Sequence, residues 1–157
     1  VMVEVPSAVY LVKEFATQID FISVGSNDLT QYLLAVDRNN PRVANIYDSL
    51  HPAVLKALKM VIDAANEGGI PVSLCGELAG DPLGAVTLVG LGYRNLSMSS
   101  SNLLRVKSVL RQIDSGWAHT IASGLLHLDD PKVVRSTLRL ALRKAGIPLT
   151  DLGILPS

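Results

Sequence analysis

The sequence is poor in cysteine and aromatic residues, and it carries no net charge. Its only cysteine, Cys75, has no partner in the chain for a disulfide, and the first residues show no charged and apolar leader pattern, so we expect a reduced, cytoplasmic protein. No apolar run approaches the ~18 residues of a membrane-spanning helix. Fourteen basic side chains balance fourteen acidic ones, which gives no long-range attraction to nucleic acid or to an anionic membrane. Recognition of an anion must therefore be local.

What is present is enough for one folded unit. The 157 residues are 48% hydrophobic, which suffices to bury a sizeable core. The first residues, VMVEVPS, enter a strand-like run directly, without a methionine at position 1. We therefore expect the chain to be a piece of a longer protein.

Hydrophobic periodicity predicts alternating strands and helices. Four short apolar runs are of strand length and alternate with segments that have apolar residues at three- and four-residue spacing. His51-Pro52 and Asp81-Pro82 are typical helix starts, while Gly68-Gly69 and Gly92 are typical helix ends. The predicted strands are Val1–Val5, Asp20–Val24, Pro71–Cys75 and Asn95–Met98, and the predicted helices are Val9–Thr17, Ala53–Asn66, Pro82–Leu91 and Leu103–Ile113.

This βαβαβαβα order predicts an α/β fold with parallel strands. The pattern fits an open doubly wound sheet and part of a (β/α)8 barrel equally well, and both place ligand chemistry beyond the carboxyl ends of the strands. The pattern changes after Ile113, so we divide the chain into residues 1–113 and a helical extension, 114–157. In the extension, a basic amphipathic helix is predicted over Pro131 to Ala145, with Trp117 docking it and its cationic side chains in solvent.

Two carboxylates follow the first two predicted strands. Glu4 ends the first run and Asp28 follows the second by four residues. At the rims of neighbouring strands they would suit Mg2+, which takes one or two protein carboxylates and fills its other positions with water and substrate oxygens. Helix caps or ordinary ion pairs are the alternative interpretation.

Asn27 and Arg38 are candidate anion ligands near the same rim. An amide donates two hydrogen bonds, and a guanidinium offers a planar fork to phosphate or carboxylate. The alternatives are a turn residue for Asn27, because Gly25 to Asp28 read as one polar turn, and an ion pair with Asp37 or another acid for Arg38.

Cys75 ends the third run, directly before Gly76 and Glu77. A lone cysteine at the end of a buried strand is often an inert small apolar residue. At the rim of a site, a thiol that is protonated at neutral pH is also suited to give a proton to carbon as a general acid. His51 is better explained as a helix-start residue than as a catalyst, and His119 and His127 show no metal-ligand spacing.

Three segments, MVEVPSA, DFISVGSNDLTQYLLAVDR and LCGELAGDP, together resemble the phosphoenolpyruvate-utilising enzymes, a family that includes Enzyme I of the bacterial sugar phosphotransferase system, pyruvate phosphate dikinase and phosphoenolpyruvate synthase. The resemblance covers roughly residues 1–113. The segments NIYDSLHPA and GLGYRNLSMSSSNLLRVKSVLRQID are most similar to the Enzyme I branch in its nitrogen-regulatory form.

The resemblance implies a fold and a set of roles. It implies that the four strands are strands 5 to 8 of a (β/α)8 TIM barrel. Glu4 and Asp28 would bind Mg2+, Asn27, Asp28 and Arg38 would bind the substrate, and Cys75 would be the catalytic proton donor. The implied reaction moves the phosphoryl group of phosphoenolpyruvate to a histidine on a separate domain and releases pyruvate.

The resemblance also implies partners and gaps. A phosphocarrier protein of the phosphotransferase system would be a partner, and the full-length protein would be a homodimer. The phosphohistidine domain and the first four barrel strands are not in this sequence, so we expect the fragment alone not to complete the reaction. A dikinase or synthase fragment, or a non-catalytic binding or oligomerisation remnant, stays an alternative.

Overall fold

The computed structural model describes residues 1–149, and its centre is a four-stranded parallel sheet in the order β1-β2-β3-β4. The strands are β1 (Met2–Val3), β2 (Ile22–Gly25), β3 (Val72–Cys75) and β4 (Asn95–Ser97). Each lies within a predicted apolar run, apart from Gly25, which extends β2 by one residue. The predicted α/β fold with parallel strands is confirmed.

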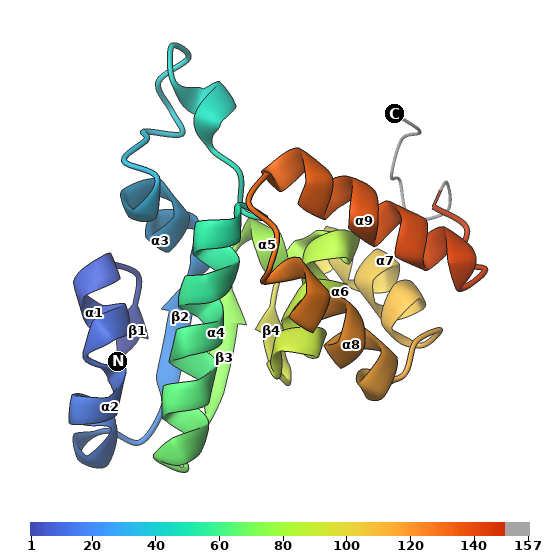
Figure 1. Cartoon of the computed structure of the whole chain (residues 1–157). Coiled ribbons are helices and arrows are strands. Elements are labelled where there is room, and N and C mark those ends of the chain that lie inside the picture. Colours follow the sequence, from blue (N-terminus) through green and yellow to red (C-terminus); the bar gives the residue numbers. More distant parts are fainter. Residues whose placement is uncertain (150–157) are drawn as a thin grey trace.

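Helices follow every strand (Figure 1). β1 leads into α1 (Pro6–Tyr10), α2 (Val12–Phe15) and the short 3-10 helix η1 (Ala16–Gln18). β2 leads into α3 (Ser26–Leu33), η2 (Ala44–Ile46) and α4 (Pro52–Glu67), and β3 into α5 (Glu77–Gly80) and α6 (Pro82–Leu91). β4 is followed by α7 (Ser100–Leu110), α8 (Ser115–Leu125) and α9 (Pro131–Lys144).

The two faces of the sheet differ because successive side chains of a strand point to opposite sides. Val3, Val24 and Leu74 are in register and fully buried, and α4 lies across this part of the sheet (Figure 1). α4 in turn contacts α1, α2 and α6. The opposite face is at least partly exposed, and three of the four residues in its register row are polar: Met2, Ser23, Ser73 and Asn95.

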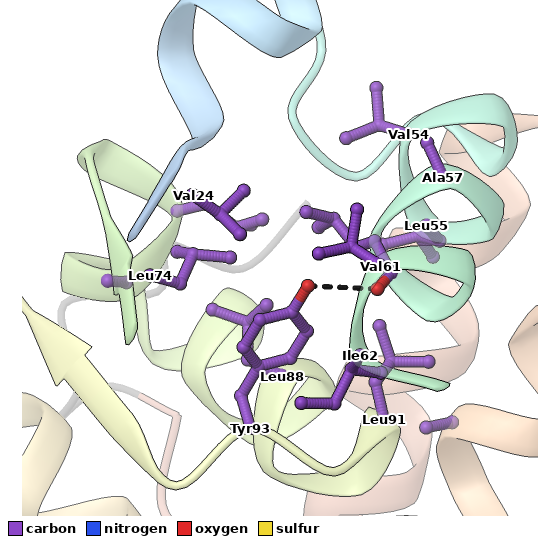
Figure 2. Packing of buried hydrophobic residues seen from close by; sticks show 14 of the residues in the cluster. Val24, Val54, Leu55, Ala57, Val61, Ile62, Leu74, Leu88, Leu91 and Tyr93 are labelled. Atoms are coloured by element: carbon purple, nitrogen blue, oxygen red, sulfur yellow. Dashed lines mark hydrogen bonds between the residues drawn. The ribbon is translucent and has the colours of Figure 1, made fainter. Parts of the chain in front are cut away.

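The core is anchored by a buried tyrosine between β4 and α4. Tyr93 has no exposed surface, and its hydroxyl donates a 2.8 Å hydrogen bond to the backbone carbonyl of Leu58. Figure 2 shows the ring surrounded by apolar side chains from the strands, α4 and α6. This burial raises the pKa of Tyr93.

The predicted bounds of α4 and α6 are confirmed to within one residue, whereas the helix predicted over Leu103–Ile113 lies three residues earlier, at Ser100–Leu110. His51 Nδ1 accepts from the Ala53 backbone N–H at 3.1 Å, and Asp81 Oδ2 accepts from that of Gly84 at 3.3 Å. Both residues therefore cap helices that begin with proline. Gly92 ends α6 in the left-handed conformation, with φ +116°.

Two local predictions are wrong. The segment predicted as a polar turn after β2 forms helix α3, because its apolar residue Leu29 is fully buried against the core. The helix predicted over Val9–Thr17 is interrupted at Leu11, where φ is −106° and ψ is 6° and the backbone N–H donates to Ala8 in a tighter turn.

The C-terminal helices pack against α6. The sequence of α6 is apolar around its whole circumference, and it contacts α4, α7, α8 and α9. At Gly90 a Cβ would lie 2.6 Å from the Cβ of Ala122 and would clash with the Ala118 carbonyl oxygen. The close approach of α6 and α8 therefore depends on a glycine at this position.

Helix α9 has nearly the predicted bounds, and it buries Val134, Leu138 and Leu142 at four-residue spacing. Trp117 packs against the core and lines a cavity together with α9 residues, as expected for a docking residue. The predicted solvent-exposed cationic face is wrong for Arg135, which pairs with Asp48, and for Arg139, whose Nε is buried without a hydrogen-bond partner among residues 1–149. The last part of the predicted extension, 150–157, lies outside the described residues. None of the helices described is long and apolar enough to cross a membrane.

Candidate active site

The carboxyl ends of the strands bring the predicted site residues to one rim. The register aligns Gly25 with Cys75 and Cys75 with Ser97, while Glu4 directly follows β1 and Asn27 lies in the first turn of α3. A cavity of about 310 Å³ opens here. Its lining residues come from three strand ends: Asn27, Cys75, Gly76, Glu77, Ser97, Met98, Ser99 and Asn102.

Asn27 joins the end of β2 to the turn after β3. Its Oδ1 accepts a 3.0 Å hydrogen bond from the Glu77 backbone N–H. This bond fixes the plane of the carboxamide and uses its acceptor, so the Nδ2 hydrogens are the group it offers to a ligand. Asn27 also lines the cavity.

Ser26 makes a second link between the same two elements. It is 1% exposed, and its hydroxyl donates to the Cys75 carbonyl oxygen at 2.8 Å. Gly76 follows with φ +120°, and a Cβ there would clash with Ser26 Oγ and lie 2.9 Å from Asn27 Oδ1. The turn that carries Cys75 thus closes tightly over the start of α3 and requires glycine.

Cys75 is partly buried and is a free cysteine. Its thiol donates to the Val24 carbonyl oxygen across the strands, with an Sγ–O distance of 3.4 Å. The arrangement therefore holds the Cys75 sulfur at the wall of the cavity.

Glu4 lies against the end of β2. Its Oε2 is 3.1 Å from where a Cβ on Gly25 would stand, so a larger residue at that position would displace the carboxylate. Asp28 is three residues further along the chain, on α3. No group of three or more metal-ligating side chains occurs in the described part of the chain. Glu4 directly after β1 and Asp28 in the first turn of α3 are the two carboxylates available here, and Mg2+ takes only one or two from a protein.

Arg38 lies beside Asp28 rather than in a close ion pair. Its Nη2 is 3.9 Å from Asp28 Oδ1, and its Nη1 is buried without a hydrogen-bond partner among residues 1–149. A buried guanidinium nitrogen without an acceptor is costly for the protein.

Tyr47 completes this side of the site, and sequence reasoning missed it. Its hydroxyl donates to the Asn27 carbonyl oxygen at 3.4 Å. Burial raises the pKa of Tyr47, and the adjacent Arg38 guanidinium opposes that effect. The ring thus packs the loop that carries Arg38 against the start of α3.

Of the predicted site residues, Asn27 and Cys75 line the cavity. Asp28 and Arg38 lie beside each other and Glu4 lies against Gly25 at the end of β2, outside the cavity lining. Ser26, Ser97, Ser99 and Asn102 were missed. Ser97 could have been found from strand register, since it aligns with Cys75. His119 is held by a 3.2 Å contact between Nδ1 and the Gly90 carbonyl oxygen on α6, away from the cavity.

Comparison with known proteins shows the family to which the chain is similar. Residues 1–115 match the family model described as PEP-utilising enzyme, PEP-binding domain. A protein named phosphoenolpyruvate-dependent phosphotransferase system, from Salmonella typhimurium, is 51% identical over 147 residues, which are 94% of this chain and 20% of that protein. The phosphoenolpyruvate-protein phosphotransferase of Borreliella burgdorferi is 48% identical over 128 residues, 82% of this chain and 22% of that protein. The phosphoenolpyruvate-protein phosphotransferase of Cupriavidus necator is 42% identical over 142 residues, which are 90% of this chain and 24% of that protein. The chain therefore spans about a fifth to a quarter of the length of these curated relatives.

Proposed function

This chain belongs to the family of PEP-utilising enzymes, and we propose that it is the phosphoenolpyruvate-binding part of a phosphoenolpyruvate-protein phosphotransferase. The observation that carries the proposal is that Asn27 and Cys75 line one cavity at the carboxyl end of the parallel sheet, with Arg38 beside Asp28, which lies on the helix that also carries Asn27. A donor amide, a guanidinium and a protonated thiol are what binding a phosphate ester and protonating its enol product require. The names of the relatives support a phosphotransferase over a dikinase or a synthase.

We further propose that the sheet is part of a (β/α)8 barrel. Support comes from the strand order, which follows the chain without the reversal that defines an open doubly wound sheet. Further support comes from the helices α2, α4 and α6, which neighbour one another in chain order. Sedimentation of the chain tests this proposal, because an exposed sheet edge favours association. A monomer that melts cooperatively would count against it.

In the proposed reaction the phosphoryl group leaves the enol oxygen of phosphoenolpyruvate for a histidine nitrogen on another domain. Arg38 and the Nδ2 group of Asn27 bind the phosphoryl oxygens and stabilise their charge during transfer. The P–O bond breaks as the N–P bond forms, which leaves enolpyruvate. The Cys75 thiol then gives its proton to the methylene carbon, forming the methyl group of pyruvate, and the thiolate regains a proton from water.

Mg2+ is the proposed cofactor, with Glu4 and Asp28 as its protein ligands. When bound, it would offset negative charge on the phosphate. The gap of 3.9 Å between Asp28 and Arg38 supports this role, since Asp28 is not committed to a close ion pair. By the same family resemblance we propose a phosphocarrier protein as partner, the cytoplasm as location and a dimeric full-length protein. The segment NIYDSLHPA supports the nitrogen-regulatory form.

Calorimetric titration of the chain with phosphoenolpyruvate, with and without Mg2+, tests the proposal. We expect Mg2+-dependent binding that Arg38→Ala weakens by at least about tenfold, since a charge-assisted bidentate contact is lost. Cys75→Ala should bind normally. Arg42→Ala is the matched control, because Arg42 is an exposed cation of the same loop. Equal affinity for Arg38→Ala and the wild type would overturn the role of Arg38, and a lack of Mg2+-dependent binding would overturn the function.

A further inference from the structure

The Ser26 hydroxyl contacts the backbone of Cys75 and nothing in the proposed chemistry uses it. We propose that Ser26 is a positioning residue, which holds the Cys75 thiol at the wall of the cavity in the orientation needed for proton transfer. The purpose of this restraint rests on the proposed function, in which Cys75 is the proton donor.

The hydrogen bond lies where the sheet stops. Gly25 and Cys75 are the last register pair of β2 and β3, and Cys75 and Ser97 are the last pair of β3 and β4, so the peptide that follows Cys75 lies where both ladders end. Ser26 Oγ restrains this peptide with a 2.8 Å bond to the Cys75 carbonyl oxygen. Because Ser26 is the first residue of α3 and is 1% exposed, its own position is set by the helix and the core.

The other side of the same peptide is held as well. Gly76 has φ +120°, and its α-carbon approaches Ser26 Oγ so closely that a Cβ would clash with it. The next backbone N–H, that of Glu77, donates to Asn27 Oδ1 at 3.0 Å. Two consecutive side chains of α3 therefore hold the carbonyl before Gly76 and the amide after it.

This restraint fixes the thiol, because the side chain of Cys75 has one rotatable bond that moves its sulfur. With the backbone fixed, the 3.4 Å bond from the thiol to the Val24 carbonyl oxygen selects one orientation. A general acid that protonates carbon depends on such orientation, since a displacement of about 1 Å at a reacting group costs on the order of 100-fold in rate. Ser26 thus links the anion-binding start of α3 to the proton donor.

Loss of the Ser26 hydrogen bond would lower stability whether the role of Ser26 is positioning or purely structural. The test therefore needs a readout that is local to Cys75. Cys75 is the only cysteine, and its rate of alkylation by iodoacetamide reports on this thiol alone. We expect Ser26→Ala to raise that rate about fivefold, the factor expected when one typical hydrogen bond is lost. Ser26→Thr retains a hydroxyl and should return the rate to within about twofold of the wild type.

Thr87→Val is the matched control. Thr87 is also 1% exposed, and its hydroxyl also donates at 2.8 Å to a backbone carbonyl, that of Leu83 within α6. It should leave the alkylation rate unchanged. Gly76→Ala is a second test variant, because its Cβ would displace the Ser26 hydroxyl without removing it, and it should raise the rate as Ser26→Ala does. Trp117 fluorescence establishes that each variant is folded.

The outcomes separate the two proposals. If Ser26→Ala and Gly76→Ala are alkylated at the wild-type rate, or Thr87→Val is accelerated equally, the positioning role is wrong even where the chain binds phosphoenolpyruvate. If Ser26→Ala accelerates alkylation but the chain shows no Mg2+-dependent binding of phosphoenolpyruvate, the restraint is real and the proposed function is wrong. Faster alkylation together with retained phosphoenolpyruvate affinity in Ser26→Ala supports both.

Discussion

Arg135 on α9 and Asp48 in the loop before α4 form a two-point ion pair across 87 residues of sequence. Nε lies 3.1 Å from Oδ2, and Nη2 lies 2.6 Å from Oδ1. The side chains are 35% and 21% exposed, so screening by solvent is incomplete. This pair attaches the C-terminal helix to the segment that carries Tyr47 and the start of α4.

Arg135→Met should lower the free energy of unfolding by about 1–2 kcal/mol, because two charge-assisted hydrogen bonds are lost at a site that is still partly solvated. Urea denaturation followed by Trp117 fluorescence measures this change. Asp48→Asn removes the charge but keeps an oxygen for the Leu50 backbone N–H, which Asp48 Oδ1 binds at 2.9 Å. A double-mutant cycle of the two variants should show that the losses are not additive.

Lys132→Met is the control for this pair. Lys132 is exposed and lies in the first turn of the same helix, where a cation is not favoured by the helix dipole. Its replacement should change stability by less than about 0.5 kcal/mol. If the losses of unfolding free energy in Arg135→Met and Asp48→Asn were additive in the double variant, Arg135 and Asp48 would act independently.

Asp81 gives the protein a defined pH dependence. Its partial burial raises its pKa above the ordinary value of 3.8, and the charge of Arg135 opposes the shift. Below about pH 3.8 the carboxyl is protonated in the folded and unfolded states, and its contribution to stability is fully present. As the pH rises through the folded pKa, the native state must hold a charged group in a desolvated position, and that contribution is lost.

Asp81→Asn should therefore gain stability relative to the wild type as the pH rises, because asparagine keeps the cap on Gly84 without the charge. Urea denaturation of both proteins at about pH 3.5 and at pH 7 gives the two differences. The difference in the free energy of unfolding should favour Asp81→Asn more at pH 7. A difference independent of pH would contradict the raised pKa of Asp81.

Removal of the Tyr93 hydroxyl should weaken the core by a measurable amount. Tyr93→Phe loses the 2.8 Å bond to the Leu58 carbonyl oxygen and should cost about 1 kcal/mol of unfolding free energy. Tyr10→Phe makes the same chemical change on a residue that is 68% exposed and should cost less than about 0.5 kcal/mol. Equal effects in thermal or urea unfolding would show that the buried bond contributes no net stability.

Sequence reasoning succeeded where local chemistry determines the structure. The short apolar runs, and the proline residues after His51 and Asp81, fixed the strands and two helix starts without reference to distant contacts. It failed at α3, whose first residues Ser26, Asn27 and Asp28 are typical of turns because their side chains compete for backbone hydrogen bonds. Burial of Leu29 decided the outcome, and burial is a tertiary effect.

The site was predictable in its residue types but not in its hydrogen bonds. Asp28 follows one apolar run and Cys75 ends another, and parallel strands bring the ends of both runs to one rim. The partner of Asn27 is 50 residues away, at Glu77, and that of Ser26 is 49 residues away, at Cys75. No local pattern marks Ser26 as more than a turn or capping residue, so its link to Cys75 required the structure.

The helix α6 is apolar on every side and is surrounded by α4, α7, α8 and α9. No face of a helix in this position accommodates a charged side chain in solvent. A charge introduced at any of its fully buried positions would have to be desolvated. It also makes the two parts of the chain, before and after residue 113, depend on one another. A chain shortened to end at Ile113 would leave the Gly90 surface of α6 exposed, and this apolar surface would promote aggregation. The sequence pattern changes after Ile113, but the packing around α6 joins the residues on both sides of that change.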